Sequence, residues 1–110
     1  MAAKKFASYM LTGTTFIELM TGAAGKDTTI TAFAANHNQN QDVKVTMALT
    51  DAPTPAGVPL EDIFELNQIV YANSSREFPG IVVPAGQKIM VRSDLPNVSF
   101  LIYGYEEDTI

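Results

Sequence analysis

The stretch from Asp42 to Thr50 alternates apolar side chains with polar or small ones at a period of two residues. The apolar positions are Val43, Val45, Met47 and Leu49. Successive side chains of a β-strand point to opposite faces of its sheet, so this period predicts a strand with one buried face. An amphipathic helix needs a period of about 3.6 residues, and the chain indicates no helix longer than one turn.

The residues before this stretch repeat the pattern. Their recurring positions are Thr28, Ile30, Ala32 and Ala34. Between the two runs, residues 36–41 are all Asn, Gln or His, a composition that is typical of turns. We therefore predict that residues 28–34 and 42–50 form an antiparallel hairpin.

Turn residues divide the rest of the chain into further short runs with strand character. We predict strands at 4–11, 15–20, 68–71, 78–83, 88–92 and 98–105, with a bulge at Pro79-Gly80. Residues 51–59 contain three prolines, which exclude a central strand and predict a long connection that crosses from one sheet to the other. Residues 60–66 fit either one helical turn or a bent strand.

These runs add up to about eight short strands within 110 residues, a length typical of one domain. The predicted fold is all-β: a single antiparallel β-sandwich over residues 1–110, jelly-roll-like, of about eight strands.

The charge of the chain argues against two classes of partner. Its net charge is −5, and its seven Lys and Arg residues are scattered along the sequence. Nucleic acids and anionic membranes are bound through clusters of basic side chains, so we expect neither as a partner. The chain has no Cys, which excludes disulfides and thiolate metal sites, and the apolar run 6–11 is too short for a signal-peptide core. We expect synthesis in the cytoplasm.

Few residues offer catalytic chemistry. His37 is the one histidine, and a role as general base or metal ligand would need partners. No Asp or Glu lies near it before Asp42, so we interpret it as a solvated loop residue. The amides at Asn36, Asn38 and Asn40 offer oxygens to a cation, but turn formation explains them better, since Asn bonds its own backbone and tolerates left-handed conformations.

The adjacent carboxylates Glu61 and Asp62 do not form an acid–base pair on a strand, because neighbouring side chains point to opposite faces. A second carboxylate brought near them by the fold would leave a glycosidase open as a remote alternative. We predict no enzyme activity, no catalytic residues, no metal ligands and no cofactor.

The last predicted strand carries apolar side chains in both phases. If Val98, Phe100 and Ile102 face the core, then Leu101, Tyr103 and Tyr105 face outward; Met90 and Phe33 are also out of phase with their neighbours. Exposed apolar surface usually marks an interaction site, and tyrosines are common interface anchors. The alternative is that this surface is covered from within, by the N-terminal segment or by the long connection. A basic N-terminus (Lys4, Lys5) and acidic residues 106–108 offer opposite charges that could pair between copies.

The second half of the chain carries two motifs with a familiar arrangement. They are Gly80-Ile81-Val82 with Ala85-Gly86 and Val91-Arg92-Ser93, followed by Asn97-Val98-Ser99 and Gly104-Tyr105-Glu106-Glu107. In these motifs the chain resembles small virion structural proteins of tailed bacteriophages. The resemblance extends over about residues 28–107, is strongest in 78–107, and leaves 51–66 unmatched.

The resemblance implies a decoration (cement) protein on the outer capsid, or a place in the neck, tail or fibre. It implies the major capsid protein lattice as partner, a homo-oligomer, dimer or trimer, and no catalytic residues. We predict an apolar contact through Met90, Leu101, Tyr103 and Tyr105, with Phe6 as a second candidate. The alternatives are a tail-fibre, neck or baseplate module that binds a receptor or glycan, and a small jelly-roll enzyme, which would lack the usual histidine cluster.

Overall fold

A computed structural model describes residues 3–109, and the alternating runs of the sequence fold into eight strands. The strands are β1 (Lys4–Leu11), β2 (Ile17–Thr21), β3 (Lys26–Asn36), β4 (Val43–Thr50), β5 (Ile63–Val70), β6 (Ser75–Val83), β7 (Lys88–Ser93) and β8 (Val98–Asp108). Two short 3-10 turns, η1 (Pro55–Gly57) and η2 (Leu60–Asp62), lie between β4 and β5. All strand pairs are antiparallel.

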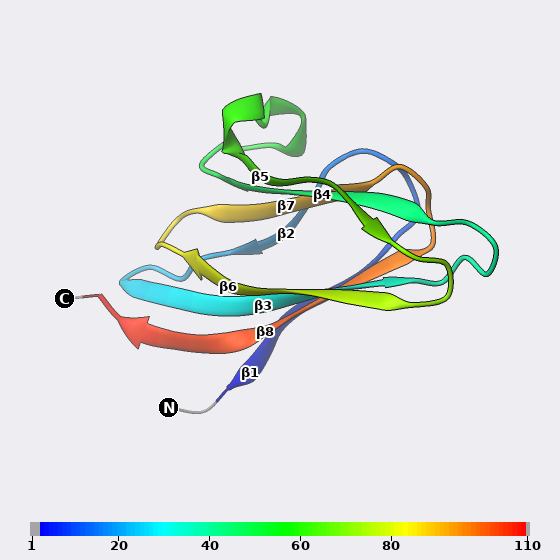
Figure 1. Cartoon of the computed structure of the whole chain (residues 1–110). Coiled ribbons are helices and arrows are strands. Elements are labelled where there is room, and N and C mark those ends of the chain that lie inside the picture. The colour runs from blue at the N-terminus through cyan, green and yellow to red at the C-terminus, as the bar shows by residue number, and fades with distance from the viewer. Residues whose placement is uncertain (1–2, 110) are drawn as a thin grey trace.

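The strands form two four-stranded sheets that pack face to face (Figure 1). Sheet A has the order β1-β8-β3-β6, and sheet B has the order β2-β7-β4-β5. This is the double Greek-key arrangement of a jelly roll. The predicted all-β, eight-stranded sandwich of jelly-roll type is confirmed.

The core lies between the two sheets and is built from the predicted phases. Sheet A contributes Ile30, Ala32, Ala34, Val98, Phe100 and Ile102, and sheet B contributes Val43, Val45, Met47, Ile89 and Val91. Each of these side chains is at most 1% exposed. On β8 the inward phase ends at Gly104, where a Cβ atom would lie 2.0 Å from the carbonyl oxygen of Thr29. A glycine is needed there because β3 comes so close.

The predicted hairpin between residues 28–34 and 42–50 is wrong. β3 pairs with β6 and β8 in sheet A, whereas β4 pairs with β5 and β7 in sheet B. The polar segment between them crosses from one layer to the other. The buried side chain of Asn36 fixes this crossing, because its amide nitrogen donates to the carbonyl oxygens of Gln41 (2.7 Å) and Val70 (3.1 Å).

The long connection is also placed differently from the prediction. Residues 51–62 join β4 to β5, which are neighbours in sheet B, so this segment does not cross between the sheets. The expected bulge at Pro79-Gly80 is confirmed, since the register of β6 against β3 shifts there and Gly80 has a φ of 73°. Residues 106–108 extend the last predicted strand, since β8 continues to Asp108.

Candidate functional site

The outer face of sheet A carries an exposed apolar surface. On β8 the outward side chains are Ser99, Leu101, Tyr103, Tyr105 and Glu107, and the residues in register on β3 are Ala35, Phe33, Thr31, Thr29 and Asp27. Leu101 is 36% exposed, Tyr103 46% and Tyr105 38%. The predicted outward orientation of these three residues is confirmed.

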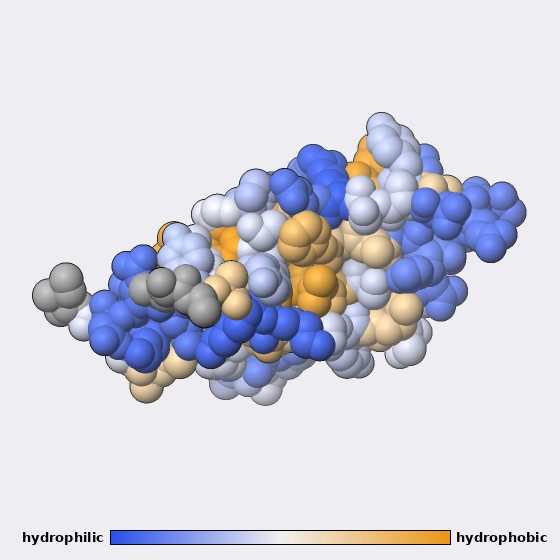
Figure 2. All heavy atoms as spheres, turned by 90° about the horizontal axis from the view of Figure 1, so that it is seen from below, coloured by the Kyte–Doolittle hydropathy of each residue, from blue (hydrophilic) through white to orange (hydrophobic). Residues whose placement is uncertain are grey.

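Two edge residues extend this surface. Met10 on β1 is in register with Ser99, and Val82 on β6 is in register with Thr29. We call the group Met10, Phe33, Val82, Leu101, Tyr103 and Tyr105 the sheet A patch. Figure 2, which views the molecule from below Figure 1, shows apolar side chains gathered in the middle of the surface, with hydrophilic ones at both ends.

Met90 does not belong to this patch, and its prediction as a contact residue is wrong. It lies on β7 in sheet B, in register with Ala48, and both residues are fully buried. Its phase is indeed opposite to that of the core residues Ile89 and Val91, so it points to the outer face of sheet B. That face is covered, which removes Met90 from any contact with a partner.

The covering segment is the connection 51–62, which folds over the outer side of sheet B (Figure 1). The Thr50 hydroxyl on β4 donates a hydrogen bond of 2.6 Å to the Asp62 carboxylate, and it accepts one of 3.1 Å from the backbone N–H of Ala52. Both Thr50 and Ala52 are buried. For Met90 the alternative of cover from within therefore holds, because Met90 is fully buried within the described chain and the connection 51–62 lies over the same side of the sheet (Figure 1).

Phe6, the second candidate, is partly buried because it packs against the core. The ammonium group of Lys4 lies 5.0 Å from the centre of its ring. The same lysine pairs with the Glu106 carboxylate at 2.9 Å within the chain. Lys4 and Glu106 therefore bind each other inside one molecule, and the suggestion that they pair between copies does not hold for them.

A second exposed apolar row, which the strand pattern does not predict, lies along β5 and continues to the residue after it. Its residues are Phe64 (39% exposed), Leu66 (56%), Ile69 (41%) and Tyr71 (66%). Leu66 and Ile69 share one side of the strand because Asn67, with a φ of 51°, adds a residue at a bulge. The sequence does contain a signal for this row. Leu66 and Ile69 are three residues apart, so in a regular strand they would lie on different faces, and only a bulge places both on the same face.

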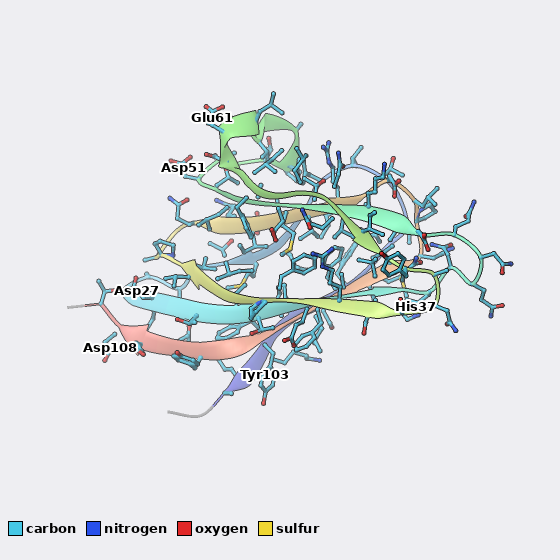
Figure 3. The ribbon with its side chains drawn as sticks, viewed as in Figure 1. Asp27, His37, Asp51, Glu61, Tyr103 and Asp108 are labelled. Carbon is cyan, nitrogen blue, oxygen red and sulfur yellow. The ribbon has the colours of Figure 1, made fainter. Side chains whose placement is uncertain are left out.

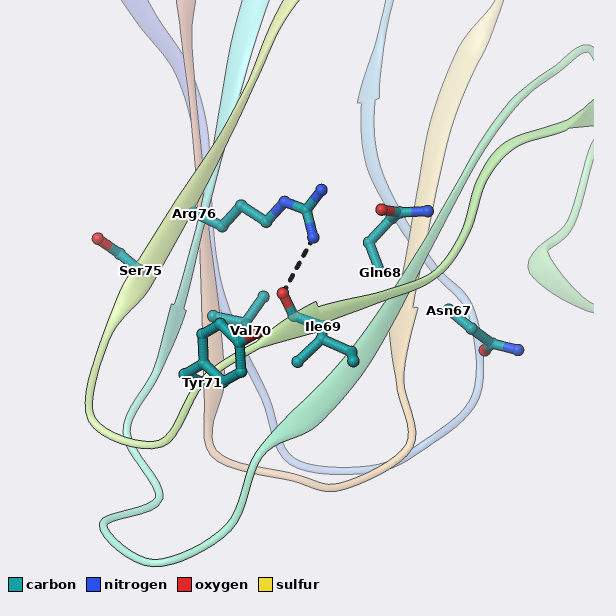
Figure 4. A pocket seen from close by; sticks show the side chains of 7 residues that line it. All are labelled: Asn67, Gln68, Ile69, Val70, Tyr71, Ser75 and Arg76. Carbon is teal, nitrogen blue, oxygen red and sulfur yellow. Dashed lines mark hydrogen bonds between the residues drawn. The ribbon is translucent and has the colours of Figure 1, made fainter.

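The backbone edge of β5 is protected even though its side chains are exposed. Arg76 of β6 donates a hydrogen bond of 3.1 Å to the carbonyl oxygen of Ile69 (Figure 4). The Gln68 amide donates one of 3.1 Å to the carbonyl oxygen of Leu66. A cavity of about 450 Å³ opens between these edge strands of the two sheets. The bulge and the two occupied carbonyls oppose the addition of another strand here.

His37 lies at the end of sheet A, exposed, and its Nε2 atom is 2.9 Å from the hydroxyl of Ser99 (Figure 3). Beside it, the Asn38 side chain donates to the carbonyl oxygen of Pro96 at 2.9 Å, and both Asn38 nitrogens donate to Asn36 Oδ1. The amides thus make the hydrogen bonds expected of turn residues. The left-handed conformations occur elsewhere, at Asn67, Asn73 and Asn97.

The opposite end of sheet A is acidic. Asp27 and Glu107 are in register on the outer face. Next to them, Lys26 and Asp108 form an ion pair that raises the pKa of Lys26 and lowers the pKa of Asp108, through a hydrogen bond and the attraction of the two charges. The sheet A patch therefore lies between an acidic end and an end that carries amides, hydroxyls and one imidazole.

The remaining candidates can be placed briefly. Asp62 accepts the Thr50 hydrogen bond, and Glu61 precedes it in η2. Within residues 3–109 no three His, Cys, Asp or Glu side chains lie close enough to hold a metal ion. Over the same residues, no helix has the length and hydropathy needed to cross a membrane.

No protein-family model matches the chain, and no curated protein shows significant sequence similarity to it.

Proposed function

We propose that this chain is a non-enzymatic structural protein of a tailed-phage virion, which decorates the outer capsid and braces neighbouring subunits of the major capsid protein as a homo-oligomer. The observation that carries the proposal is the sheet A patch, with Leu101, Tyr103 and Tyr105 held outward on a rigid sheet. An exposed apolar patch rich in tyrosine at the centre of a sheet face suits protein–protein contact. The motifs of residues 78–107 supply the phage context.

The mechanism would be passive. Each copy contributes a modest interface, and the symmetry of a capsid repeats that interface many times. A rigid sheet loses little conformational entropy when it docks, because its backbone and many of its side chains are already ordered. The sum of many small contacts would oppose the expansion or rupture of the shell.

The first test asks whether the protein is in the particle and where. Virions of the phage that encodes this chain are purified, and their proteins are identified by mass spectrometry. A gold-labelled antibody against this chain is then located on the virions by electron microscopy. Label over the heads supports decoration. Label confined to the tail, neck or fibre supports the alternative, and absence from washed virions rejects both.

A second test uses two exposed tyrosines on different faces as matched variants. Tyr103→Glu places a charge in the sheet A patch, and Tyr71→Glu places the same charge beside β5. We expect both variants to fold, and we expect Tyr103→Glu to bind undecorated heads at least about tenfold more weakly, because the patch is buried in the assembled protein, whether against the capsid or against a second copy, and a carboxylate there would lack a partner. Equal binding by both variants would contradict the role of sheet A.

One observation favours the receptor- or glycan-binding alternative. Residues 37–41 contain no Phe, Tyr or Trp side chain, but the fold brings Tyr71 to this end, where its carbonyl oxygen accepts a hydrogen bond from Ser74. Asn73 in the same turn donates from its backbone to Asn38 at 2.9 Å. An exposed ring beside amides and hydroxyls suits a sugar. Under this alternative Tyr71→Glu, and not Tyr103→Glu, would abolish binding to host cells.

A further inference from the structure

We propose that two copies of this chain pack their sheet A patches together about a twofold axis that runs across the strands, so that β8 of one copy lies antiparallel to β8 of the other. The inference rests on the proposed function, which needs self-association, and adds the partner face and its orientation. Three features of the described residues support it: blocked sheet edges, an uneven charge distribution and a symmetric register.

The edges of both sheets oppose strand addition, so assembly must use a face. β6 contains Pro79, which has no N–H to donate, next to the bulge at Gly80. β5 is bulged at Asn67 and has two carbonyls occupied by side chains. β1 shifts register between Lys5 and Ala7, and β2 has only five residues. Each of these features is a known device against edge pairing.

The charges of sheet A select one orientation of two facing copies. Asp27 and Glu107 occupy one end of the face, and His37 and Ser99 occupy the other, as the labels of Figure 3 show for Asp27 and His37. A twofold axis along the strands would place four carboxylates against one another. An axis across the strands places the acidic end of each copy on the hydroxyl and imidazole end of the other, which avoids the repulsion and offers hydrogen-bond donors to the carboxylates.

The register makes the face suitable for this symmetry. Tyr103 is in register with Thr31, and it stands midway along β8 between Ser99 and Glu107. An axis over Tyr103 lays Leu101 of each copy on Tyr105 of the other. The two Tyr103 rings then meet at the centre, where offset stacking of aromatic rings is favourable.

The size of the face predicts a weak dimer. Four strands about 4.8 Å apart and about eight residues long cover roughly 500 Å² per copy, or about 1,000 Å² in total. This is at the lower limit for specific interfaces, so we expect a reversible dimer with a dissociation constant on the order of micromolar. Lys5 of both copies would approach at the β1 edge, where long side chains can separate into solvent.

The test is sedimentation equilibrium at low salt with charge reversals at the two ends of the face. His37→Glu would bring a third carboxylate to the Asp27 and Glu107 of the other copy, and we expect it to weaken the dimer about fivefold or more. Glu107→Lys alone would have a smaller effect. The double variant restores opposite charges at both ends, so we expect its dissociation constant within about twofold of the wild type. Glu61→Lys, with the same charge change on the connection, should leave the dimer unchanged.

Several results would overturn the inference. A wild-type monomer up to about 200 µM would remove the dimer. Additive effects of the two reversals would remove the antiparallel orientation, because non-additivity reports that the two groups interact. Thermal melting followed by circular dichroism checks that every variant is folded. A monomer that is nonetheless found on phage heads would overturn the dimer and the homo-oligomeric state but leave the proposed place on the capsid intact. A dimer that is absent from virions would overturn the proposed function and leave the dimer intact.

Discussion

The outer faces of both sheets carry apolar residues, but these residues are buried on sheet B and exposed on sheet A. On sheet B, Met90 and Ala48 point away from the core and are fully buried. On sheet A, Leu101 and Tyr103 also point away from the core and are 36% and 46% exposed. The difference lies in the segment 51–62, which covers part of sheet B and has no counterpart on sheet A within residues 3–109. An apolar residue in the outward phase is therefore evidence of a contact, but the contact can be made inside the chain.

The largest predicted effect follows from this difference. Met90→Ala should lower the free energy of unfolding by about 2–5 kcal/mol, because it leaves a cavity between the sheet and its cover. Tyr103→Ala should cost under about 1 kcal/mol in the monomer, because its side chain is 46% exposed and lies outside the core. Urea unfolding of both variants measures the two free energies of unfolding. The protein concentration is kept low enough that no dimer forms.

One result would contradict the difference between the two outer faces. If Tyr103→Ala proves as costly as Met90→Ala in the monomer, the sheet A patch is covered in solution by some part of the chain. Leu101→Ala serves as a second probe of the same face, and it should follow Tyr103→Ala.

Much of the fold follows from the sequence because burial acts on each strand separately. The inward phases of β4 and β8 are predicted correctly, since Val43 and Val45 on one, and Phe100 and Ile102 on the other, need a buried side wherever their strands pair. The prediction that β4 has only one buried face is wrong, because Thr46, Ala48 and Thr50 on its other face are buried as well. The partners of the strands could not be predicted in this way. The buried faces of β3 and β4 would be satisfied equally well if the two strands lay in opposite sheets or paired in one hairpin. The alternation of apolar residues does not distinguish these two arrangements.

The candidate site was only partly predictable for a related reason. The outward phase of Tyr103 is local information, whereas the burial of Met90 depends on where a proline-rich connection comes to rest. The row on β5 was missed because the bulge at Asn67 changes the phase of the strand, and a fixed period of two places Leu66 and Ile69 on different faces. The period of the apolar residues therefore predicts neither the packing of distant segments nor local bulges in a strand.

The second prediction tests what holds the cover on sheet B. Asp62→Ala removes the acceptor of the buried Thr50 hydroxyl, so the fold should lose about 1–3 kcal/mol. Thr50→Val removes the donor to Asp62 and also leaves the backbone N–H of the buried Ala52 without its acceptor, so it should cost at least as much. Hydrogen exchange should then show faster exchange in residues 51–62, with the strands of sheet A unchanged. An equal increase over both sheets would mean that the cover is part of the global folding unit.

The smallest predicted effect concerns the acidic end of sheet A. Lys26 and Asp108 join β3 to the end of β8, and their side chains are 41% and 84% exposed, so the pair contributes little and salt should screen it. The pKa of Lys26 is raised above 10.5, so its contribution is complete below that pH and is lost as the pH rises through the raised value. The pKa of Asp108 is lowered below 3.8, so its contribution is present above that pH and is lost as the pH falls through the lowered value.

The pair should therefore stabilise the fold only between about pH 4 and pH 10. The measurement is the difference in free energy of unfolding between the wild type and Asp108→Asn, followed by urea titration across this range. We expect a small difference at neutral pH that shrinks toward pH 3. Lys26→Met should remove the same contribution, and the double variant should lose no more than either single variant, because the two residues act on each other. A difference that persists unchanged at pH 3 would mean that the Asp108 side chain stabilises the end of β8 without its charge, and the ion pair would then not be the source of its effect.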